Sequence, residues 1–460
     1  MRLLIECSFV YENPEINTGI PRVVRNVVAR LNQSCEPECV PVIIRGSQLR
    51  HVIQLAPIGK PVRWLPRLER ILRGVSALCG LMHASLDRKP VLVAHPALRK
   101  VWGWSYRILS APVAIGKQIT RLLKQPYLDP GRSVPMQMQS GDVLLLLDAG
   151  WLMMDRSLVE SCRARGVQVV VLIYDLIPLT HPQFFRGALN HIFCDWFAWV
   201  ARNADGFMMI SATVRDEVRQ QVAQYRPASQ SDEGPGVPWF DYFHLGTELD
   251  RTVASAAVNP AIAALFQERA VYLMVSTIEP RKNHAYLLDA FELLWAAGQD
   301  VSLCFIGRNG WKNKALMRRI DNHAELGRKL FVFSDADDGD LEYAYCHARA
   351  LVFSSVVEGF GLPLVEAMQR GLPSMVSDIP VFREIGQDYA AYFDLTQPQT
   401  LADLVQRFES SGLFPAHRSL QGWSWLDWNG ATAQLTERIL AQCNGGLAAD
   451  ARAGHSQRKN

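Results

Sequence analysis

The chain has 460 residues, of which 49% are hydrophobic and 20% charged, with a formal net charge of +3 and a mean hydropathy of +0.00. This length exceeds what one hydrophobic core usually organises, so we expect a globular protein with two domains. The chain starts as a buried strand that contains Glu6, and no uncharged apolar run approaches about 18 residues, so neither a signal peptide nor a membrane-spanning helix is expected. Nine cysteines without a repeated spacing indicate reduced thiols and argue against a zinc site.

The first half of the chain alternates strand-like and helix-like segments. We expect a strand over residues 2–10 and a helix that opens at Ile20-Pro21-Arg22, because proline fits the first turn of a helix. Gly19 lets the backbone approach a ligand, and the helix start behind it can face a phosphate or a sugar. Further strands are expected at residues 40–44, 142–147, 168–173, 206–210 and 237–245. This alternation predicts a parallel, doubly wound sheet.

Residues 45–135 interrupt the pattern with a basic segment. It holds sixteen Lys and Arg residues against three acids, a net charge of +13 within a chain whose total is +3. Trp64, Leu68 and Leu72 fall on one helix-like face beside several arginines. Such a surface suits anionic lipid headgroups, so we expect a cytoplasmic protein in peripheral contact with the inner face of the membrane. A solvated basic face that packs on another subunit is the alternative. No recognition motif for nucleic acid accompanies the charge.

The second half restarts the alternation after a boundary near residues 246–260. Strands are expected at residues 270–275, 301–306, 330–333, 351–353, 372–377 and 391–393, with helices at 283–297 and 341–349. These elements predict a second α/β sheet with its own core. A last helix over residues 427–443 precedes a polar tail, 444–460, which we expect to be disordered.

Two cations stand at the end of the first strand of the second half. In the run Ser276–Asn283, Arg281 and Lys282 come directly before a helix, and ligands of open α/β sheets bind outside the carboxyl ends of strands. A diphosphate leaving group needs neutralising charge, which Arg281 and Lys282 can supply in place of a metal. A simple cap on a helix start is the other interpretation of this pair.

A strand, a glycine-bearing loop and a helix start follow one another at residues 350–366. Backbone N–H groups and a helix dipole can meet an anion at such a place. Glu358 lies in the loop, from which it can reach outward, and Glu366 lies about one turn into the helix, where it can accept hydrogen bonds from vicinal hydroxyls. Together with Arg281 and Lys282, these acids predict a nucleotide-sugar pocket.

Residues 277–283, 306–311 and 358–371, continued by 377–380 and 383–384, resemble the family-4 retaining glycosyltransferases of the GT-B fold. The resemblance covers most of residues 270–395. It is thinner in the first half, where residues 18–22 and 174–179 resemble a branch that builds bacterial surface polysaccharides, including O-antigens. The resemblance implies an α/β fold with two Rossmann-like, doubly wound domains that face a central cleft.

The resemblance also implies a domain arrangement. Residues 1–248 would form the acceptor-binding domain, with the basic segment as an insertion, and residues 249–425 the nucleotide-sugar-binding domain. The last helix, about 426–443, would pack back on the first domain.

Roles for individual residues follow from the same resemblance. Arg281 and Lys282 would contact the diphosphate, and Glu366 the ribose. Glu358, with the loop residues Phe360, Gly361 and Leu362, would hold the donor sugar, and Gly19 would lie opposite, close to the phosphates. The family often places a histidine before an acid where this chain has Tyr174 and Asp175. His181 could substitute for that histidine, and Asp175 could orient its loop or contact the acceptor.

We therefore predict a retaining glycosyltransferase that needs no metal and no cofactor. It would move a sugar from a nucleotide diphospho-sugar to a saccharide or lipid-linked glycan during surface-polysaccharide synthesis. The Glu-Pro-Arg-Lys-Asn run resembles the form frequent among relatives that use GDP-mannose, which the resemblance therefore favours as donor, while UDP- and dTDP-sugars stay open. A GT-B sugar-nucleotide epimerase and a non-catalytic scaffold of a membrane-associated assembly complex are the alternatives.

Overall fold

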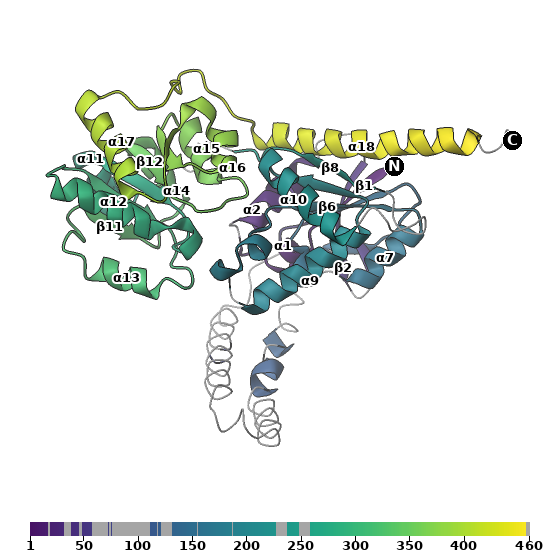
Figure 1. The fold of residues 1–460 in the computed structure, drawn as a ribbon. Helices are drawn as coiled ribbons and strands as arrows, with labels where there is room; N and C mark the ends of the chain where they lie inside the picture. Colours follow the sequence, from purple (N-terminus) through teal and green to yellow (C-terminus); the bar gives the residue numbers. More distant parts are fainter. Residues whose placement is uncertain are drawn as a thin grey trace, which may run out of the picture.

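A computed structural model gives the arrangement of the chain in two halves, each built on its own sheet (Figure 1). It describes residues 1–16, 19–31, 38–45, 48–57, 72, 75, 111–116, 118–120, 131–153, 155–185, 187–226, 237–247 and 258–456. Most of the basic segment and residues 248–257 of the expected boundary lie outside these ranges. The predicted fold class, α/β with two doubly wound sheets, is confirmed.

The N-terminal half contains an eight-stranded sheet in the order β4-β3-β2-β1-β5-β6-β7-β8. Its strands are β1 Arg2–Glu6, β2 Glu38–Arg45, β3 Gln48–Val52, β4 Ser133–Pro135, β5 Val143–Leu146, β6 Gln168–Ile173, β7 Gly206–Met209 and β8 Trp239–Tyr242. Its helices are α1 Ser8–Glu12, α2 Ile20–Leu31, α6 Gly150–Met153, α7 Arg156–Ala164, α8 Ile177–Thr180, η1 Pro182–Phe184, α9 Gly187–Asn203 and α10 Ala212–Tyr225. The central strands are parallel and buried on both faces, as their continuous apolar sequences predict.

The C-terminal half contains a six-stranded parallel sheet in the order β11-β10-β9-β12-β13-β14. Its strands are β9 Val271–Val275, β10 Ser302–Ile306, β11 Leu330–Phe333, β12 Ala350–Phe353, β13 Ser374–Ser377 and β14 Ala391–Phe393. Its helices are α11 Pro260–Glu268, η3 Pro280–Lys282, α12 His284–Ala296, α13 Lys314–Asp321, α14 Asp338–His347, α15 Leu362–Gln369, α16 Pro380–Gly386, η4 Gln387–Tyr389 and α17 Pro398–Ser411. The strand order reverses between β9 and β12, where such sheets bind ligands.

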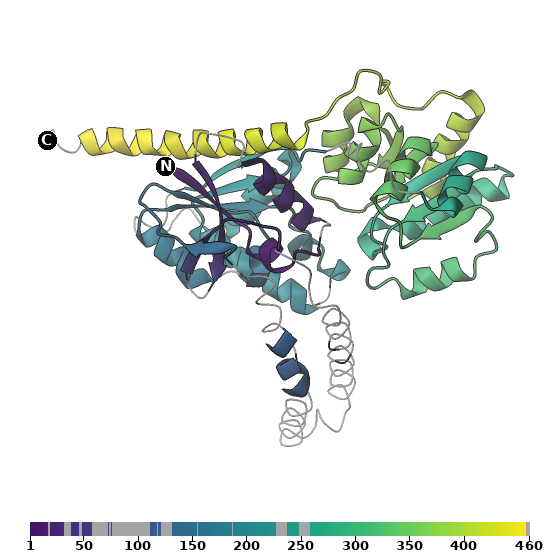
Figure 2. The same cartoon turned by 180° about the vertical axis from the view of Figure 1, so that it is seen from behind.

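The last helix, α18 (Trp428–Ser456), returns to the N-terminal half and lies along it (Figures 1 and 2). It packs on α2 and β8, and Trp428 is one of its buried side chains. The helix continues to Ser456, past residue 443, where the sequence predicted its end. Four alanines between residues 448 and 453, the best helix formers, account for the continuation.

The chain crosses between the two halves near residues 246 and 426, and these two crossing segments lie side by side. The N–H of Thr247 donates to the carbonyl of Leu426 at 3.1 Å, and the indole N–H of Trp425 donates to the carbonyl of Leu245 at 2.8 Å. A Cβ on Gly246 would lie 2.6 Å from the carbonyl oxygen of Asp427, so only glycine allows the two backbones to come this close.

Two expectations for the N-terminal half are corrected. The first strand ends at Glu6, not residue 10, because acid side chains stabilise the short helix α1 that follows: Glu6 accepts from the N–H of Ser8 at 2.7 Å, and Asp148 from the N–H of Val10 at 2.8 Å. In addition, the two ends of the basic segment form β3 and β4, which extend the sheet with antiparallel pairing. No helix in the described part of the chain is long and apolar enough to span a membrane.

Candidate active site

The predicted cations and the loop carboxylate meet at the carboxyl ends of β9 and β12. Arg281 Nη1 lies 2.9 Å from Glu358 Oε2, and the ammonium of Lys282 pairs with the other oxygen of the same carboxylate. Arg281 Nε also pairs with Glu279 at 2.6 Å, and the hydroxyl of Ser355 donates to Glu358 at 2.7 Å. Glu358 therefore does not reach outward, as its loop position suggested. It turns onto the two cations, and its side chain is only 8% exposed.

This arrangement fixes the charge of Glu358. Burial by itself would raise the pKa of its carboxyl, but Arg281 and Lys282 lower that pKa to about 2. The pKa of Lys282 is lowered by its own burial and by neighbouring Arg281, while Glu358 opposes the shift. Glu358 is thus an anion at every ordinary pH and can only accept hydrogen bonds.

The loop that carries Glu358 lies directly against the N-terminal half. A Cβ on Gly359 would lie 2.2 Å from the carbonyl oxygen of Tyr174, so glycine is needed where the loop crosses the end of β6. Phe360 is buried, with its ring centroid 6.0 Å from those of His244 and Trp425. Gly361, with a φ of 95°, and Leu362 begin α15. The loop is therefore held by both halves.

Glu366 has partners that the sequence did not indicate. One oxygen lies 2.7 Å from Nη1 of Arg22, which belongs to α2 of the N-terminal half, and the other accepts from the hydroxyl of Tyr345 at 3.0 Å. Gly19 stands just before α2 with a φ of 63°, and nothing lies within 4 Å of where its Cβ would be. The start of α2 and the α15 carboxylate therefore face each other across the cleft.

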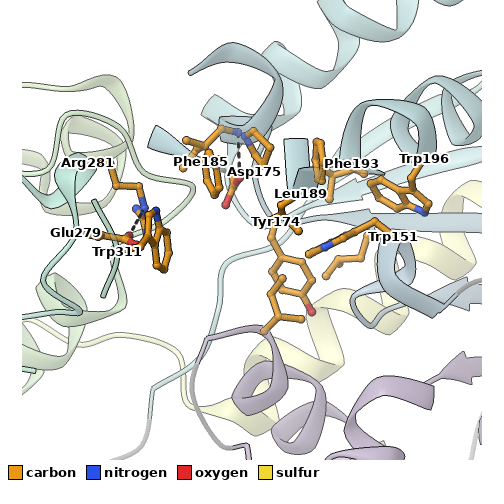
Figure 3. A pocket seen from close by; sticks show the side chains of 15 residues that line it. Trp151, Tyr174, Asp175, Phe185, Leu189, Phe193, Trp196, Glu279, Arg281 and Trp311 are labelled. Carbon is orange, nitrogen blue, oxygen red and sulfur yellow. Dashed lines mark hydrogen bonds and ion pairs between the residues drawn. The ribbon is translucent and has the colours of Figure 1, made fainter. Parts of the chain in front are cut away.

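A cavity of about 160 Å³ lies between the two halves beside Arg281 (Figure 3). Asp175 lines it, directly after β6, and accepts from the N–H of Ile177 at 3.0 Å. Burial raises the pKa of Asp175, against the opposing effect of Arg281. Apart from Glu279 and Arg281, the remaining lining residues are apolar, with aromatic and aliphatic side chains in equal share. Trp311 closes the cavity from the C-terminal half, and its indole N–H donates to the carbonyl of Phe184 at 2.8 Å.

His181 and Tyr174 occupy different settings. His181 contacts its own segment: Nδ1 lies 2.9 Å from the hydroxyl of Thr180, and the ring stacks on Phe184 with centroids 6.0 Å apart. Tyr174 is buried and donates its hydroxyl to the carbonyl of Leu147 at 2.9 Å. The structure therefore does not bring His181 into the cluster of Arg281, Lys282 and Glu358.

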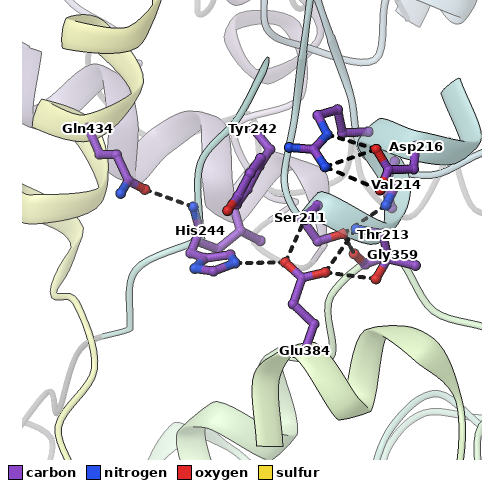
Figure 4. Close-up of polar contacts among 12 residues, drawn as sticks. Ser211, Thr213, Val214, Asp216, Tyr242, His244, Gly359, Glu384 and Gln434 are labelled. Carbon is purple, nitrogen blue, oxygen red and sulfur yellow. Dashed lines mark hydrogen bonds and ion pairs between the residues drawn. The ribbon is translucent and has the colours of Figure 1, made fainter. Parts of the chain in front are cut away.

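A second contact between the halves was missed by the sequence analysis, which noted Glu384 without giving it a role. Glu384, on α16, points at the start of α10 (Figure 4) and accepts from the N–H groups of Ala212 and Thr213, both at 2.8 Å. His244 Nε2 lies 2.8 Å from the same carboxylate. Burial would raise the pKa of Glu384, but these hydrogen bonds lower it to about 2. Beside it, the hydroxyl of Ser211 donates to the carbonyl of Gly359 at 2.9 Å.

Two further buried acids lie at the carboxyl ends of β1 and β5. Burial, followed by the charge of Asp148, raises the pKa of Glu6 to about 7, and burial raises the pKa of Asp148 to about 6. In the sequence, Glu6 stands out as an acid inside an apolar strand, but only the structure shows that Asp148 lies beside it. Within the described residues, no group of three or more His, Cys, Asp or Glu side chains is arranged to hold a metal ion.

Comparison with known proteins places these features in a family. Residues 257–421 match the family model described as glycosyl transferases group 1. The chain is 33% identical over 314 residues to the serotype-specific mannosyltransferase WbdA of Escherichia coli, which covers 67% of this chain and 38% of the relative. It is 30% identical over 166 residues to O-antigen chain mannosyltransferase B of the same organism, covering 35% of this chain and 43% of the relative. The chain thus spans less than half the length of the curated relatives it matches.

Two solved structures share the fold over nearly the whole chain. The α,α-trehalose 6-phosphate synthase of Burkholderia multivorans superimposes with a TM-score of 0.56 at 14% identity, covering 100% of this chain and 98% of the other. The sucrose-phosphate synthase of Thermosynechococcus elongatus does so with a TM-score of 0.53 at 16% identity, covering 96% and 100%. Both sheets and the cleft between them follow the GT-B arrangement. Residues 257–421 therefore form a domain of the group 1 glycosyltransferase family, and the chain is related to O-antigen mannosyltransferases.

Proposed function

We propose that this chain transfers mannose, with retention of configuration and without a metal ion, from GDP-mannose to a saccharide or lipid-linked glycan in surface-polysaccharide synthesis. The observation that carries the proposal is the pairing of Arg281 and Lys282 with Glu358 at the carboxyl ends of β9 and β12, facing the N-terminal half. The relatives named above are mannosyltransferases, which supports mannose as the transferred sugar.

The cations account for leaving-group stabilisation. When the bond between the anomeric carbon and the diphosphate breaks, Arg281 and Lys282 would neutralise the charge that develops on the phosphate oxygens. The anomeric carbon then bonds to the acceptor hydroxyl, whose proton passes to a donor phosphate oxygen. Because the positive charge comes from fixed side chains, this step needs no metal ion.

The acids would position the donor. Glu358, an anion with a pKa of about 2, cannot donate a proton and would instead accept hydrogen bonds from the sugar hydroxyls. Glu366 would accept from the ribose hydroxyls and would share its carboxylate with Arg22. Gly19 at the start of α2 would lie close to the phosphates. The basic segment would contact anionic headgroups at the inner face of the cytoplasmic membrane.

A thermal-shift comparison of GDP, UDP, dTDP and ADP tests the donor site. A ligand at 100 times its Kd stabilises the folded state by about 2.7 kcal/mol, so GDP should raise the melting temperature most. No shift with any of the four would overturn the proposal.

Product analysis with GDP-mannose then tests the reaction. An α-mannoside formed with retention supports the proposal. Release of a free, altered sugar would identify an epimerase instead. Donor binding without turnover across a panel of mannosyl, glucosyl and lipid-linked acceptors would identify a non-catalytic scaffold.

A further inference from the structure

The loop between α1 and α2 is held by one arginine of α2. Arg25 Nη2 lies 3.1 Å from the carbonyl oxygen of Asn13 and 3.0 Å from that of Pro14. The carbonyl oxygens of Val10 and Ile16 lie 3.5 Å and 3.4 Å from the same nitrogen, and Arg25 Nε lies 3.4 Å from the carbonyl oxygen of Ile16. A single guanidinium therefore gathers four carbonyls of one short stretch of chain.

Arg25 serves the backbone and not a charged partner. Within the described residues, every hydrogen bond that Arg25 makes goes to a backbone carbonyl. Residues 13–16 lie outside any helix or strand, so their carbonyls have no regular ladder of donors. A guanidinium offers several N–H donors in a rigid planar arrangement, which suits a set of carbonyls that converge on one point. An arginine used in this way fixes the path of the chain.

Asp148, at the carboxyl end of β5, holds the same stretch from the other side. Its Oδ2 accepts from the N–H of Val10 at 2.8 Å, while the carbonyl of Val10 faces Arg25. Burial raises the pKa of Asp148, and the nearby charge of Arg25 opposes that shift. The end of α1 and the loop behind it are therefore held between an acid of the sheet edge and an arginine of α2.

This stretch leads directly to the part of α2 that faces the C-terminal half. Gly19 follows Ile16 by three residues, and its carbonyl accepts from the N–H of Arg22 at 3.1 Å in the first turn of α2. Arg22 lies about one turn before Arg25 and pairs with Glu366 across the cleft. The helix that carries Arg25 therefore also carries the residues that face the expected donor.

We propose that Arg25 is a positioning residue for the donor: it holds residues 10–16 so that Gly19 and the start of α2 are in place before the diphosphate binds. The inference rests on the proposed function, because it concerns the donor side of that site. Arg25 would not touch the donor. Its carbonyl contacts would act only through the loop.

This role predicts a change in binding and not in the chemical step. Without Arg25, the loop would sample other conformations, and the donor would bind only the fraction of molecules in which Gly19 is in place. The apparent affinity for the donor falls by that fraction, whereas the complex, once formed, has the loop in its normal conformation. The donor KM should therefore rise while kcat changes little.

Two substitutions at Arg25 and one control separate loop positioning from charge. Arg25→Met removes the guanidinium and keeps a long side chain. Arg25→Lys keeps the positive charge but replaces the planar guanidinium with a single ammonium. The matched control is Arg219→Met, which removes an exposed arginine of α10 whose guanidinium lies 5.6 Å from the ring centroid of Phe240.

Calorimetric titration with GDP, and with UDP as a second nucleotide, measures donor binding in the wild type and the three variants. We expect Arg25→Met to weaken GDP binding and to raise the donor KM, each by about tenfold or more. Its kcat and acceptor KM should change by less than about threefold, because the bound complex is unaltered. Arg25→Lys should bind GDP about threefold or more weakly than the wild type, and Arg219→Met should match the wild type.

Hydrogen exchange followed by mass spectrometry reports on the loop without any ligand. The N–H of Asn13 donates to the carbonyl of Phe9 at 2.9 Å, and the N–H of Ile16 to the carbonyl of Asn13 at 3.2 Å. In Arg25→Met, a peptide covering residues 10–16 should exchange about tenfold faster or more, while a peptide covering β6 keeps the wild-type rate. A general folding defect would speed up both.

The outcomes separate this inference from the proposed function. Wild-type GDP binding by Arg25→Met, with normal transfer, would overturn the positioning role and leave the proposed function standing. Full GDP binding by Arg25→Lys would overturn it too, since charge alone would then explain Arg25→Met, and so would faster exchange in β6. Binding of UDP in place of GDP that depends on Arg25 would support the positioning role while GDP-mannose fails as donor. A wild type that binds neither nucleotide would overturn both.

Discussion

Glu358 on the C-terminal edge of the cleft and three acids on the N-terminal edge have pKa values that are shifted in opposite directions. On the C-terminal edge, Glu358 sits between Arg281 and Lys282, and its pKa falls to about 2. On the N-terminal edge, Glu6, Asp148 and Asp175 lie at the carboxyl ends of β1, β5 and β6, and burial raises the pKa of each. A buried carboxyl is therefore a fixed anion at Glu358 and a protonatable group at Glu6, Asp148 and Asp175.

This difference suits two different ligands. A diphosphate needs cations whose geometry is already set, and Glu358 holds Arg281 and Lys282 in place while no donor is bound. A neutral acceptor needs weakly charged groups that accept hydrogen bonds without attracting phosphate. This difference supports our proposal that the donor binds at the C-terminal edge and the acceptor at the N-terminal edge, and substitutions on each edge should separate the two.

The largest effect is expected from a substitution on the C-terminal edge. Lys282→Ala should lower kcat/KM by about 10²–10³-fold, because one charge that stabilises the leaving diphosphate is lost. Initial rates with varied donor check this. Lys314→Ala removes an exposed lysine at the start of α13 and should leave the rate unchanged. Equal rates for Lys282→Ala and the wild type would remove the cation pair from the mechanism.

A smaller loss of activity is expected from Asp175→Asn on the N-terminal edge. Acceptor-dependent turnover should fall by about 10-fold or more, while GDP binding stays close to wild type. Because burial raises the pKa of Asp175 above its usual value, the wild-type rate should decline on the acid side at a higher pH than a free aspartate would give. That acid limb should disappear in the variant, and a pH–rate profile that keeps it would assign the limb to another group.

The contact at the start of α10 should have a moderate effect. The Glu384 carboxylate accepts hydrogen bonds from two backbone N–H groups across the cleft, and Glu384→Gln removes its charge. This loss should destabilise the closed form by about 1–2 kcal/mol, which lowers its population about tenfold. Small-angle scattering with GDP should show a more open particle. Glu409→Gln, which changes an acid paired with Tyr272 and Arg349 within the C-terminal half, should show no opening.

The smallest effect concerns stability alone. The pKa of Glu6 is about 7 in the folded protein and 4.5 for an unperturbed glutamate, so the folded state binds more protons between these values and stability falls as pH rises through them. Urea unfolding should find the wild type less stable at pH 8 than at pH 5.5 by on the order of 1–2 kcal/mol from this source. Glu6→Gln should flatten that slope. The lowered pKa values of Glu358 and Glu384 act below about pH 4.5, outside this window.

The sequence was most informative where the residues that interact follow strands of the same sheet. The Glu-Pro-Arg-Lys-Asn run and the loop at Glu358 predicted a cluster that the structure assembles, because each follows a strand of the same parallel sheet. Contacts with residues of the opposite half could not be predicted from the sequence. Nothing near Glu366 in the sequence indicates Arg22, and nothing near Glu384 indicates the start of α10, since these contacts depend on how two separately folded sheets face each other.

Errors in the elements had local causes as well. The apolar side chains of Phe9 and Val10 favour a strand that continues past Glu6, but the side chains of Glu6 and Asp148 stabilise a helical turn there. Strand β3 and the edge strand β4 were missed because both are short and lie at the two ends of the basic segment. The polarity of the tail predicts disorder, although its alanines favour a helix.

The paired crossing at Thr247 and Leu426 limits how the molecule can work. Because the two segments are hydrogen-bonded to each other, they would act as a hinge that allows rotation of one half about a single axis and resists translation and twisting. The buried start of α18 fixes one of the two segments to the N-terminal half. Each swing would therefore return Gly359 to the same spot under Tyr174, so that successive turnovers start from one reproducible alignment of donor and acceptor.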